Sequence, residues 1–146
     1  MTVLKKSYFI KARDFLRAGE ASIAVQNLLK SMNLNAKLIR RVAICGYEGE
    51  MNVVMHGGDG RLSVEINAEN LIMEITDDGP GIEDIDLAMQ PGFSTASDEY
   101  REMGFGAGMG LPNIKTNSDE LTIVSHKNHG TCVRMVFHLD EQGVPQ

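Results

Sequence analysis

The first third of the chain passes from an alternating to a helical pattern of apolar residues. Residues 7–10 alternate in polarity, which predicts a short strand. Asp14 is the predicted N-cap of a first helix that stops near Asn33, because apolar residues recur between them at helical spacing. Asn35 is the predicted cap of a longer helix, which the glycine pair 57–58 ends. The apolar residues that define these helices are Phe15, Ile23, Leu28, Leu29 and Met32 in the first, and Leu38, Ile39, Val42, Cys45, Met51 and Met55 in the second.

The remaining regular segments form two alternating pairs. A tight turn at 68–70 separates the first pair and a turn at 128–130 separates the second, so both are predicted to be antiparallel hairpins. A helix is expected to begin at about residues 109–111, just before the second hairpin. The predicted strands span residues 61–67, 71–76, 121–126 and 131–138.

Residues 77–110 have a different character, because they are rich in glycine, contain two prolines and a Ser-Thr cluster, and only residues 85–89 suggest a short helix. A loop of that length within a compact domain is usually functional or disordered. With helices in one group and mainly antiparallel strands in the other, we expect a two-layer α+β sandwich. Residues 1–139 are predicted to form one domain, and residues 140–146 a frayed polar tail.

Composition narrows the classes of function. Twenty acidic against fourteen basic residues give a net charge of −6, which argues against a nucleic-acid partner. The sequence contains no apolar run long enough for a membrane span, and its start does not resemble a signal peptide. Cys45 and Cys132 lie in apolar segments, where buried reduced thiols are expected. We therefore expect a cytoplasmic protein.

The first candidate site is the pair Glu48 and Asn52, which stand four residues apart and so on one face of the predicted long helix. An amide carbonyl can ligate Mg²⁺, and a carboxylate one turn away can accept a proton from a hydroxyl or water that attacks a phosphate. A solvated polar stripe is the alternative interpretation. Glu50 faces elsewhere on the helix and is expected at the surface.

The second candidate is the run from Asp77 to Gly81 at the end of a predicted strand. A carboxylate emerging from a strand can accept a hydrogen bond from an exocyclic amino group such as that of adenine. Gly79 and Gly81 would let the backbone approach the ring closely. Ordinary turn chemistry explains the same residues equally well.

The third candidate is the glycine-rich run from Gly104 to Gly110, which leads directly into a helix at Leu111. Alternating glycines free backbone N–H groups to point at phosphate oxygens, and a helix N-terminus adds partial positive charge. The position of the run, late in the chain and after a long loop, disfavours a dinucleotide-binding motif, and the sequence contains no P-loop. A hinge for a mobile lid is the alternative.

Taken together and in this order, the three runs resemble the N, G1 and G2 boxes of the GHKL ATPase superfamily, which includes the ATP-binding domains of gyrase, histidine kinases and MutL and has the Bergerat fold. The texts DLAMQPGFSTAS and GMGLPNIKTNSDEL are most similar to the serine-kinase branch, which includes the anti-sigma-factor kinases and the RsbT-type switch kinases. The Gly-Leu-Pro after the G2 box is closer to the RsbT type. This resemblance covers nearly the whole chain.

The resemblance implies roles for the matching positions. Asn52 would ligate Mg²⁺ that bridges the phosphates of ATP, and Glu48 would be the general base. Asp77 would recognise adenine with help from Thr131, and residues 90–106 would form a lid over the triphosphate. The remaining residues expected to contact the nucleotide are Gly79, Gly81, Ser94, Thr95, Arg101, Gly104, Gly106, Gly108, Met109, Gly110 and Leu111.

The resemblance implies a protein serine/threonine kinase of a partner-switching system. Its substrate would be a STAS-type anti-sigma-factor antagonist, and a sigma factor or a phosphatase could be a further partner. Two alternatives stay open: a nucleotide-dependent binding module with little phosphoryl transfer, and the ATP-binding half of a split histidine kinase. A homodimer is compatible with the apolar first helix. The four residues Arg13, Arg17, Arg40 and Arg41 either meet an acidic partner or are solvated helix charges.

Overall fold

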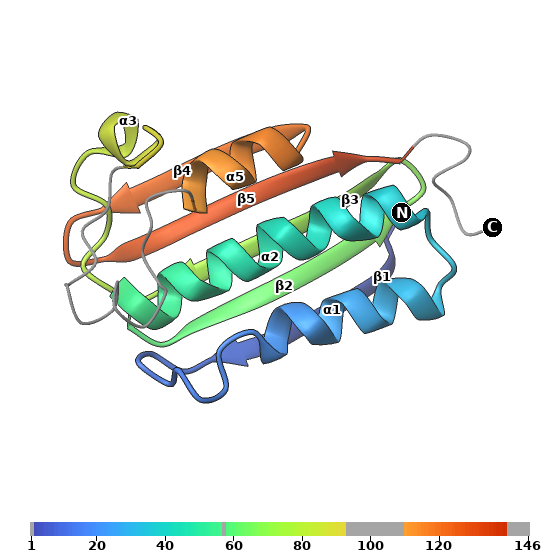
Figure 1. Ribbon diagram of the computed structural model, residues 1–146, viewed down its shortest axis with the longest axis horizontal. Helices are drawn as coiled ribbons and strands as arrows, with labels where there is room; N and C mark the ends of the chain where they lie inside the picture. The colour runs from blue at the N-terminus through green and yellow to red at the C-terminus, as the bar shows by residue number, and fades with distance from the viewer. Residues whose placement is uncertain (1, 57, 93–109, 140–146) are drawn as a thin grey trace.

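The computed structural model describes residues 2–56, 58–92 and 110–139. Five strands form one antiparallel sheet in the order β1-β2-β3-β5-β4, and helices cover one of its faces (Figure 1). The strands are β1 (Thr2–Ile10), β2 (Gly60–Asn67), β3 (Asn70–Asp77), β4 (Glu120–His126) and β5 (Gly130–His138). The helices are α1 (Glu20–Ser31), α2 (Ala36–His56), α3 (Ile85–Ala88) and α5 (Gly110–Asn117). The predicted two-layer α+β class is confirmed.

The core lies between this sheet and the helices. Alternate residues of β2, β3 and β5 face the helices and are almost fully buried, whereas most of their neighbours are half-buried or exposed, as expected for an antiparallel sheet covered on one side; Val136 on β5 is an exception at 5% exposed. The inward residues are Leu62, Val64, Ile66, Leu71, Met73, Ile75, Val133, Met135 and Phe137. The alternation in the sequence therefore determined which face is buried.

The long helix α2 lies close to the centre of the sheet. A Cβ atom at Gly49 would overlap Cδ1 of Ile75 on β3, and one at Gly46 would lie 3.3 Å from Cβ of Ser22 on α1. Larger side chains at 46 and 49 would push α2 away from its two neighbours. The two glycines therefore allow α2 to pack close to β3 and α1, and this close packing fixes the position of the polar residues that α2 carries.

Most predicted elements occur at or within a few residues of the expected positions. Asn35 caps α2, since its Oδ1 accepts hydrogen bonds from the backbone N–H groups of Lys37 at 2.8 Å and Leu38 at 3.4 Å. Both hairpins and the short helix α3 are present. The first strand is longer than predicted, because β1 pairs with β2 along almost its whole length.

The predicted start of the first helix at Asp14 was wrong. Helix α1 begins at Glu20, after Gly19 in a left-handed conformation with φ of 98°. Asp14 instead accepts a hydrogen bond from the backbone N–H of Arg17 at 3.2 Å in the preceding turn. Phe15 lies outside the helix and packs against the buried Met51 and Met55 of α2. Its apolar character thus reflected packing and not helical periodicity.

Other expectations concern the ends of elements and the thiols. Gly57, which was predicted to end α2, and the tail 140–146 lie outside the described residues. Cys45 and Cys132 are free thiols, and Cys45 is buried. None of the helices within 2–56, 58–92 and 110–139 has the length and apolar character needed to cross a bilayer.

Candidate functional site

Helix α2 and the start of α5 bring Glu48 and Asn52 close to Gly110, the last residue of the third candidate run, whose residues 104–109 lie outside the described ranges. A Cβ atom built on Gly110, the first residue of α5, would lie 3.3 Å from Oε2 of Glu48 and 3.3 Å from Oδ1 of Asn52. Both side chains of the pair therefore converge on the end of α5 that the glycine-rich run enters. A side chain at position 110 would crowd both polar groups, so glycine keeps the space beside them open.

The Glu48 carboxyl is in an environment that favours its protonated form. Burial raises the pKa of Glu48 above its ordinary value of 4.5. Its oxygens form no hydrogen bond with any residue in the described part of the chain. A half-buried carboxyl without internal partners and with a raised pKa suits a proton acceptor.

Contacts at the C-terminal half of α5 hold this short helix on α2. Nε of Arg41 donates to the carbonyl of Asn117 at 2.9 Å, and its guanidinium pairs with Asp119 at 3.0 Å. The same guanidinium lies 5.7 Å from the ring centre of Phe137 on β5. These contacts, together with the buried Ile114, place the other end of α5 beside Glu48.

Asp77 occupies the last position of β3, where it pairs with Gly60 of β2. Its Oδ1 accepts a hydrogen bond from the backbone N–H of Gly79 at 2.7 Å, which shapes the turn after the strand. The pKa of Asp77 is raised above its ordinary value, and burial is the main cause. The hydrogen bond from Gly79 lowers this pKa, whereas the charge of the neighbouring Asp78 raises it further. In the sheet Asp77 pairs directly with Thr131 of β5, so the two residues predicted to recognise a base lie side by side.

Gly130 and Ser125, which the sequence analysis missed, organise the surroundings of Asp77. Gly130 has a φ of 85°, and a Cβ there would overlap the Asp77 carbonyl oxygen. Ser125 Oγ accepts from the backbone N–H of Ile82 at 2.6 Å and lies 3.0 Å from Oγ1 of Thr131. The position of Gly130 at the end of a predicted turn could have indicated a structural role for this glycine, but no local signal distinguishes Ser125.

Gly81 has a structural role besides the expected contact with a nucleotide, which stays a prediction. Its φ is 85°, and a Cβ would lie 2.7 Å from the carbonyl oxygen of His126 at the end of β4. The glycine thus lets the loop after β3 pack against the β4–β5 turn, which the hydrogen bond from Asn128 N to the Pro80 carbonyl at 2.9 Å reinforces. Close approach to a base is not needed to explain glycine at this position.

The expectation that Glu50 lies at the surface was wrong. Glu50 is 3% exposed, and its carboxylate accepts hydrogen bonds from the backbone N–H groups of Gly19 at 2.9 Å, Ala21 at 3.3 Å and Ser22 at 2.9 Å. These are orphan donors at the start of α1, where negative charge also interacts favourably with the helix dipole. The carboxylate from α2 therefore caps α1, the role that the sequence assigned to Asp14.

The remaining residues predicted to contact the nucleotide are either buried in the core or lie outside the described residues. Leu111 is 6% exposed and belongs to the apolar core, beneath the start of α5. The others lie outside the described residues, namely Ser94, Thr95, Arg101, Gly104, Gly106, Gly108 and Met109.

The five-stranded antiparallel sheet with helices on one face is consistent with the fold of a GHKL ATPase domain. The chain belongs to the family described as histidine kinase-, DNA gyrase B-, and HSP90-like ATPase, whose model matches residues 46–142. Membership in this family implies that the chain binds ATP.

Named relatives place the chain near a regulatory branch of the family. It is 36% identical over 97 residues to an anti-sigma F factor of Thermoanaerobacter sp., a match that covers 63% of this chain and 64% of that protein, less than two thirds of its length. It is 32% identical over 142 residues to an anti-sigma F factor of Anoxybacillus flavithermus, covering 93% of this chain and 90% of that protein. These findings support the predicted anti-sigma-factor branch. The closer RsbT-type assignment stays a prediction.

A solved structure shows the same fold. The RsbU and RsbW domains of a Mycobacterium tuberculosis protein match with a TM-score of 0.59 and 14% identity, over 90% of this chain and 32% of that one.

Proposed function

We propose that this chain is an ATP- and Mg²⁺-dependent protein serine/threonine kinase of a partner-switching system. Its substrate would be a STAS-type anti-sigma-factor antagonist or a similar small regulatory protein. The observation that carries this proposal is the convergence of Glu48 and Asn52 on Gly110, at the entry to the helix that follows the glycine-rich run.

The donor set at this position fits a magnesium site. Asn52 offers a neutral amide oxygen, Glu48 lies beside it, and Mg²⁺ prefers a few protein oxygens completed by phosphate oxygens and water. Asn52 would be the protein ligand. When bound, the ion would neutralise charge on the phosphates during transfer.

Glu48 is the residue that moves a proton in this proposal. A serine or threonine hydroxyl of the partner protein loses its proton to the Glu48 carboxylate as its oxygen bonds to the γ-phosphorus of ATP. The bond from that phosphorus to the β,γ-bridging oxygen breaks, and ADP leaves with the electron pair. Asp77 and Thr131, paired on adjacent strands, would hold the adenine and so fix the distance of the γ-phosphate from Glu48.

The name anti-sigma F factor carried by the relatives favours a second function. In that case the domain would sequester a sigma factor in a nucleotide-dependent manner, with little phosphoryl transfer. The same nucleotide site serves both functions.

Incubation of the purified chain with labelled ATP and a candidate STAS protein separates the two. We expect phosphoserine or phosphothreonine on the partner, and we expect Glu48→Gln to bind ATP as the parent does but to lose transfer. If no label appears while ATP still changes affinity for a sigma factor, the binding function is the correct one. If folded Asn52→Ala and Asp77→Asn proteins bind Mg-ATP as tightly as the parent, both proposals fail.

A further inference from the structure

Three polar residues line up across adjacent strands, at the end of the sheet nearest α3 (Figure 1). Asp77 of β3 pairs directly with Thr131 of β5, and Thr131 pairs directly with Ser125 of β4. Directly paired residues point to the same face of a sheet. Ile75 and Val133, each two positions away along a strand, are buried in the core. This polar row therefore lies on the face of the sheet that the helices cover.

Ser125 joins the polar row to the loop that follows β3. Its Oγ accepts a hydrogen bond from the backbone N–H of Ile82 at 2.6 Å. The same Oγ lies 3.0 Å from Oγ1 of Thr131 and 3.4 Å from the carbonyl oxygen of Gly130. The loop comes so close that a Cβ atom on Gly81 would lie 2.9 Å from this Oγ. One hydroxyl thus holds both the loop and the first residues of β5.

The distances around Ser125 indicate which hydroxyl group donates. A serine hydroxyl has one hydrogen and two lone pairs, and the N–H of Ile82 occupies one of the lone pairs. Hydrogen bonds donated by a hydroxyl to an oxygen are about 2.5–3.0 Å long. The contact with Thr131 is within that range at 3.0 Å, whereas the contact with Gly130 is long at 3.4 Å. The hydrogen of Ser125 therefore points to Thr131, and the hydrogen of Thr131 stays available to a ligand.

Asp77 supplies an acceptor beside this donor. Its Oδ1 accepts the N–H of Gly79 at 2.7 Å, and its Oδ2 receives no hydrogen bond from any residue of the described ranges. The polar row thus offers an acceptor and a donor on directly paired residues. The edge of adenine offers the complementary pair, an amino group that donates and the ring nitrogen N1 that accepts. Hypoxanthine, the base of inosine, offers the reverse, a carbonyl oxygen and an N1–H.

We propose that Ser125 is a positioning residue that sets the base specificity of the nucleotide site, because it holds the Thr131 hydroxyl as a donor. With this donor fixed, N1 of adenine finds a partner, whereas the N1–H of hypoxanthine or guanine meets another hydrogen. A base that fails to pair leaves polar groups of the site without partners, and this loss is the source of selectivity. The inference deepens the proposed function and rests on it, because Asp77 and Thr131 are the residues proposed to hold adenine.

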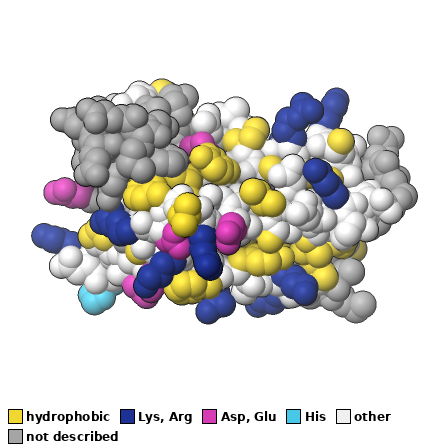
Figure 2. All heavy atoms as spheres, turned by 60° about the horizontal axis from the view of Figure 1, so that its bottom comes forward, with side chains coloured by type: hydrophobic (Ala, Val, Ile, Leu, Met, Phe, Trp, Pro, Cys, Tyr) yellow, Lys and Arg dark blue, Asp and Glu magenta, His cyan; other side chains and the backbone are white. Residues whose placement is uncertain are grey.

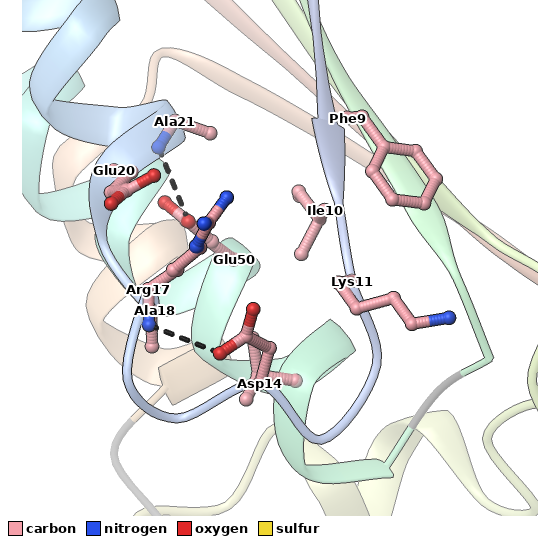
Figure 3. A pocket seen from close by; sticks show the side chains of 10 residues that line it. Phe9, Ile10, Lys11, Asp14, Arg17, Ala18, Glu20, Ala21 and Glu50 are labelled. Atoms are coloured by element: carbon pink, nitrogen blue, oxygen red, sulfur yellow. Dashed lines mark hydrogen bonds between the residues drawn. The ribbon is translucent and has the colours of Figure 1, made fainter.

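The pocket of about 320 Å³ between β1 and the start of α1 lies apart from the polar row, because β1 and β4 are opposite edges of the sheet. Asp14, Glu20 and Glu50 line this pocket beside Lys11 and Arg17 (Figure 3). Figure 2 shows acidic and basic side chains intermingled with apolar ones on this side of the molecule. Glu50 accepts three backbone hydrogen bonds there. A substitution of Glu50 therefore perturbs the fold without touching the polar row.

The test compares the binding of adenosine diphosphate and inosine diphosphate, with Mg²⁺, to the full purified chain by calorimetry. The two nucleotides differ only in the base, and neither carries a γ-phosphate that could be transferred. We expect the parent to prefer adenosine diphosphate by about tenfold or more. Ser125→Ala should lower this preference about fivefold, because the Thr131 hydroxyl can then turn and accept from inosine. Ser125→Thr keeps the hydroxyl and should leave the preference within about twofold of the parent.

Further variants separate positioning from stability. Thr131→Val should lose the preference as Ser125→Ala does, and the double variant should differ from Thr131→Val by less than about twofold. Ser118→Ala removes another half-buried hydroxyl, which donates to the carbonyl of Ile114 at 2.8 Å. Glu50→Gln destabilises the fold. Both of these control variants should keep the preference of the parent.

A Ser125→Ala chain that melts at a lower temperature but keeps the full preference would overturn the inference, because Ser125 would then be only structural. Additive losses in the double variant would also overturn it, because Ser125 would then not act through Thr131. Equal binding of the two nucleotides by the parent would overturn it together with the proposed role of Asp77 in base recognition. The preference is measured without phosphoryl transfer, so the kinase proposal can fail while this inference holds.

Discussion

Replacing Glu50 by glutamine should destabilise the protein much more than the same replacement at Glu48. The Glu50 carboxylate accepts three backbone N–H groups at the start of α1 and is 3% exposed. A glutamine keeps one acceptor oxygen and turns an NH₂ group towards donors, so at least one buried N–H loses its partner. Charge-assisted hydrogen bonds contribute about 1.5–3 kcal/mol each and neutral ones about 1 kcal/mol.

From these values we expect Glu50→Gln to lower the free energy of unfolding by about 2–3 kcal/mol. Loss of the favourable charge at the N-terminus of α1 is part of that total, at roughly 0.3–1 kcal/mol. Glu50→Ala leaves all three donors unpaired and should cost about 3–5 kcal/mol. For a chain of this length, 1 kcal/mol corresponds to roughly 3 °C in Tm, so the glutamine variant should melt about 6–9 °C below the parent.

Urea denaturation followed by far-UV circular dichroism at neutral pH measures these differences. Glu48→Gln is the matched control, because it lies on the same helix and its carboxyl has no hydrogen bond within the described residues. Burial disfavours the ionised form of Glu48, so neutralising it should leave stability within about 0.5 kcal/mol of the parent or raise it slightly. If Glu50→Gln costs no more than Glu48→Gln, the capping role of Glu50 is refuted.

Three further results are expected. Arg41→Gln removes the contacts that hold α5 on α2 and should weaken binding of a non-hydrolysable ATP analogue about three- to tenfold in calorimetry. Arg40→Gln makes the same charge change at an exposed neighbouring residue and should leave this binding unchanged. Equal effects of the two substitutions would argue against the role of Arg41 in holding α5 on α2. The rate of phosphoryl transfer should rise with pH through a pKa above 4.5, because burial raises the pKa of Glu48 and only its carboxylate accepts a proton. The folded protein holds the Glu48 proton more tightly than the unfolded chain does, so the contribution of Glu48 to stability falls as pH rises through this raised pKa. A transfer rate that does not depend on pH would contradict the role of Glu48 as proton acceptor. Gly130→Ala should lower the Tm more than Gly92→Ala, although both residues have a positive φ. A Cβ at position 130 would overlap the backbone of Asp77, whereas one at position 92 meets nothing within 4 Å. Equal losses of stability would mean that only the positive φ matters.

The sequence by itself determined the elements and the order of the sites. Alternation of apolar residues located both hairpins, because in an extended chain successive side chains point to opposite sides. The amide of Asn35 marked the start of α2, since capping depends only on residues two and three positions away. The spacing of Glu48 and Asn52 placed them on one face of the helix before any neighbour was known.

Only the tertiary structure decided what each of these groups contacts. Glu50 differs from a surface glutamate in no local respect, yet packing of α2 against the start of α1 makes it a buried cap, and Asp14 loses that role. The close backbone contacts of Gly81 and Gly130 could not be predicted from the sequence, because they depend on the end of β4 and the carbonyl of Asp77, which lie beside these glycines only in the folded chain. The physical reason is range: periodicity and capping act over a few residues, whereas a buried charge or a close backbone approach depends on elements that meet only when the sheet and helices pack together.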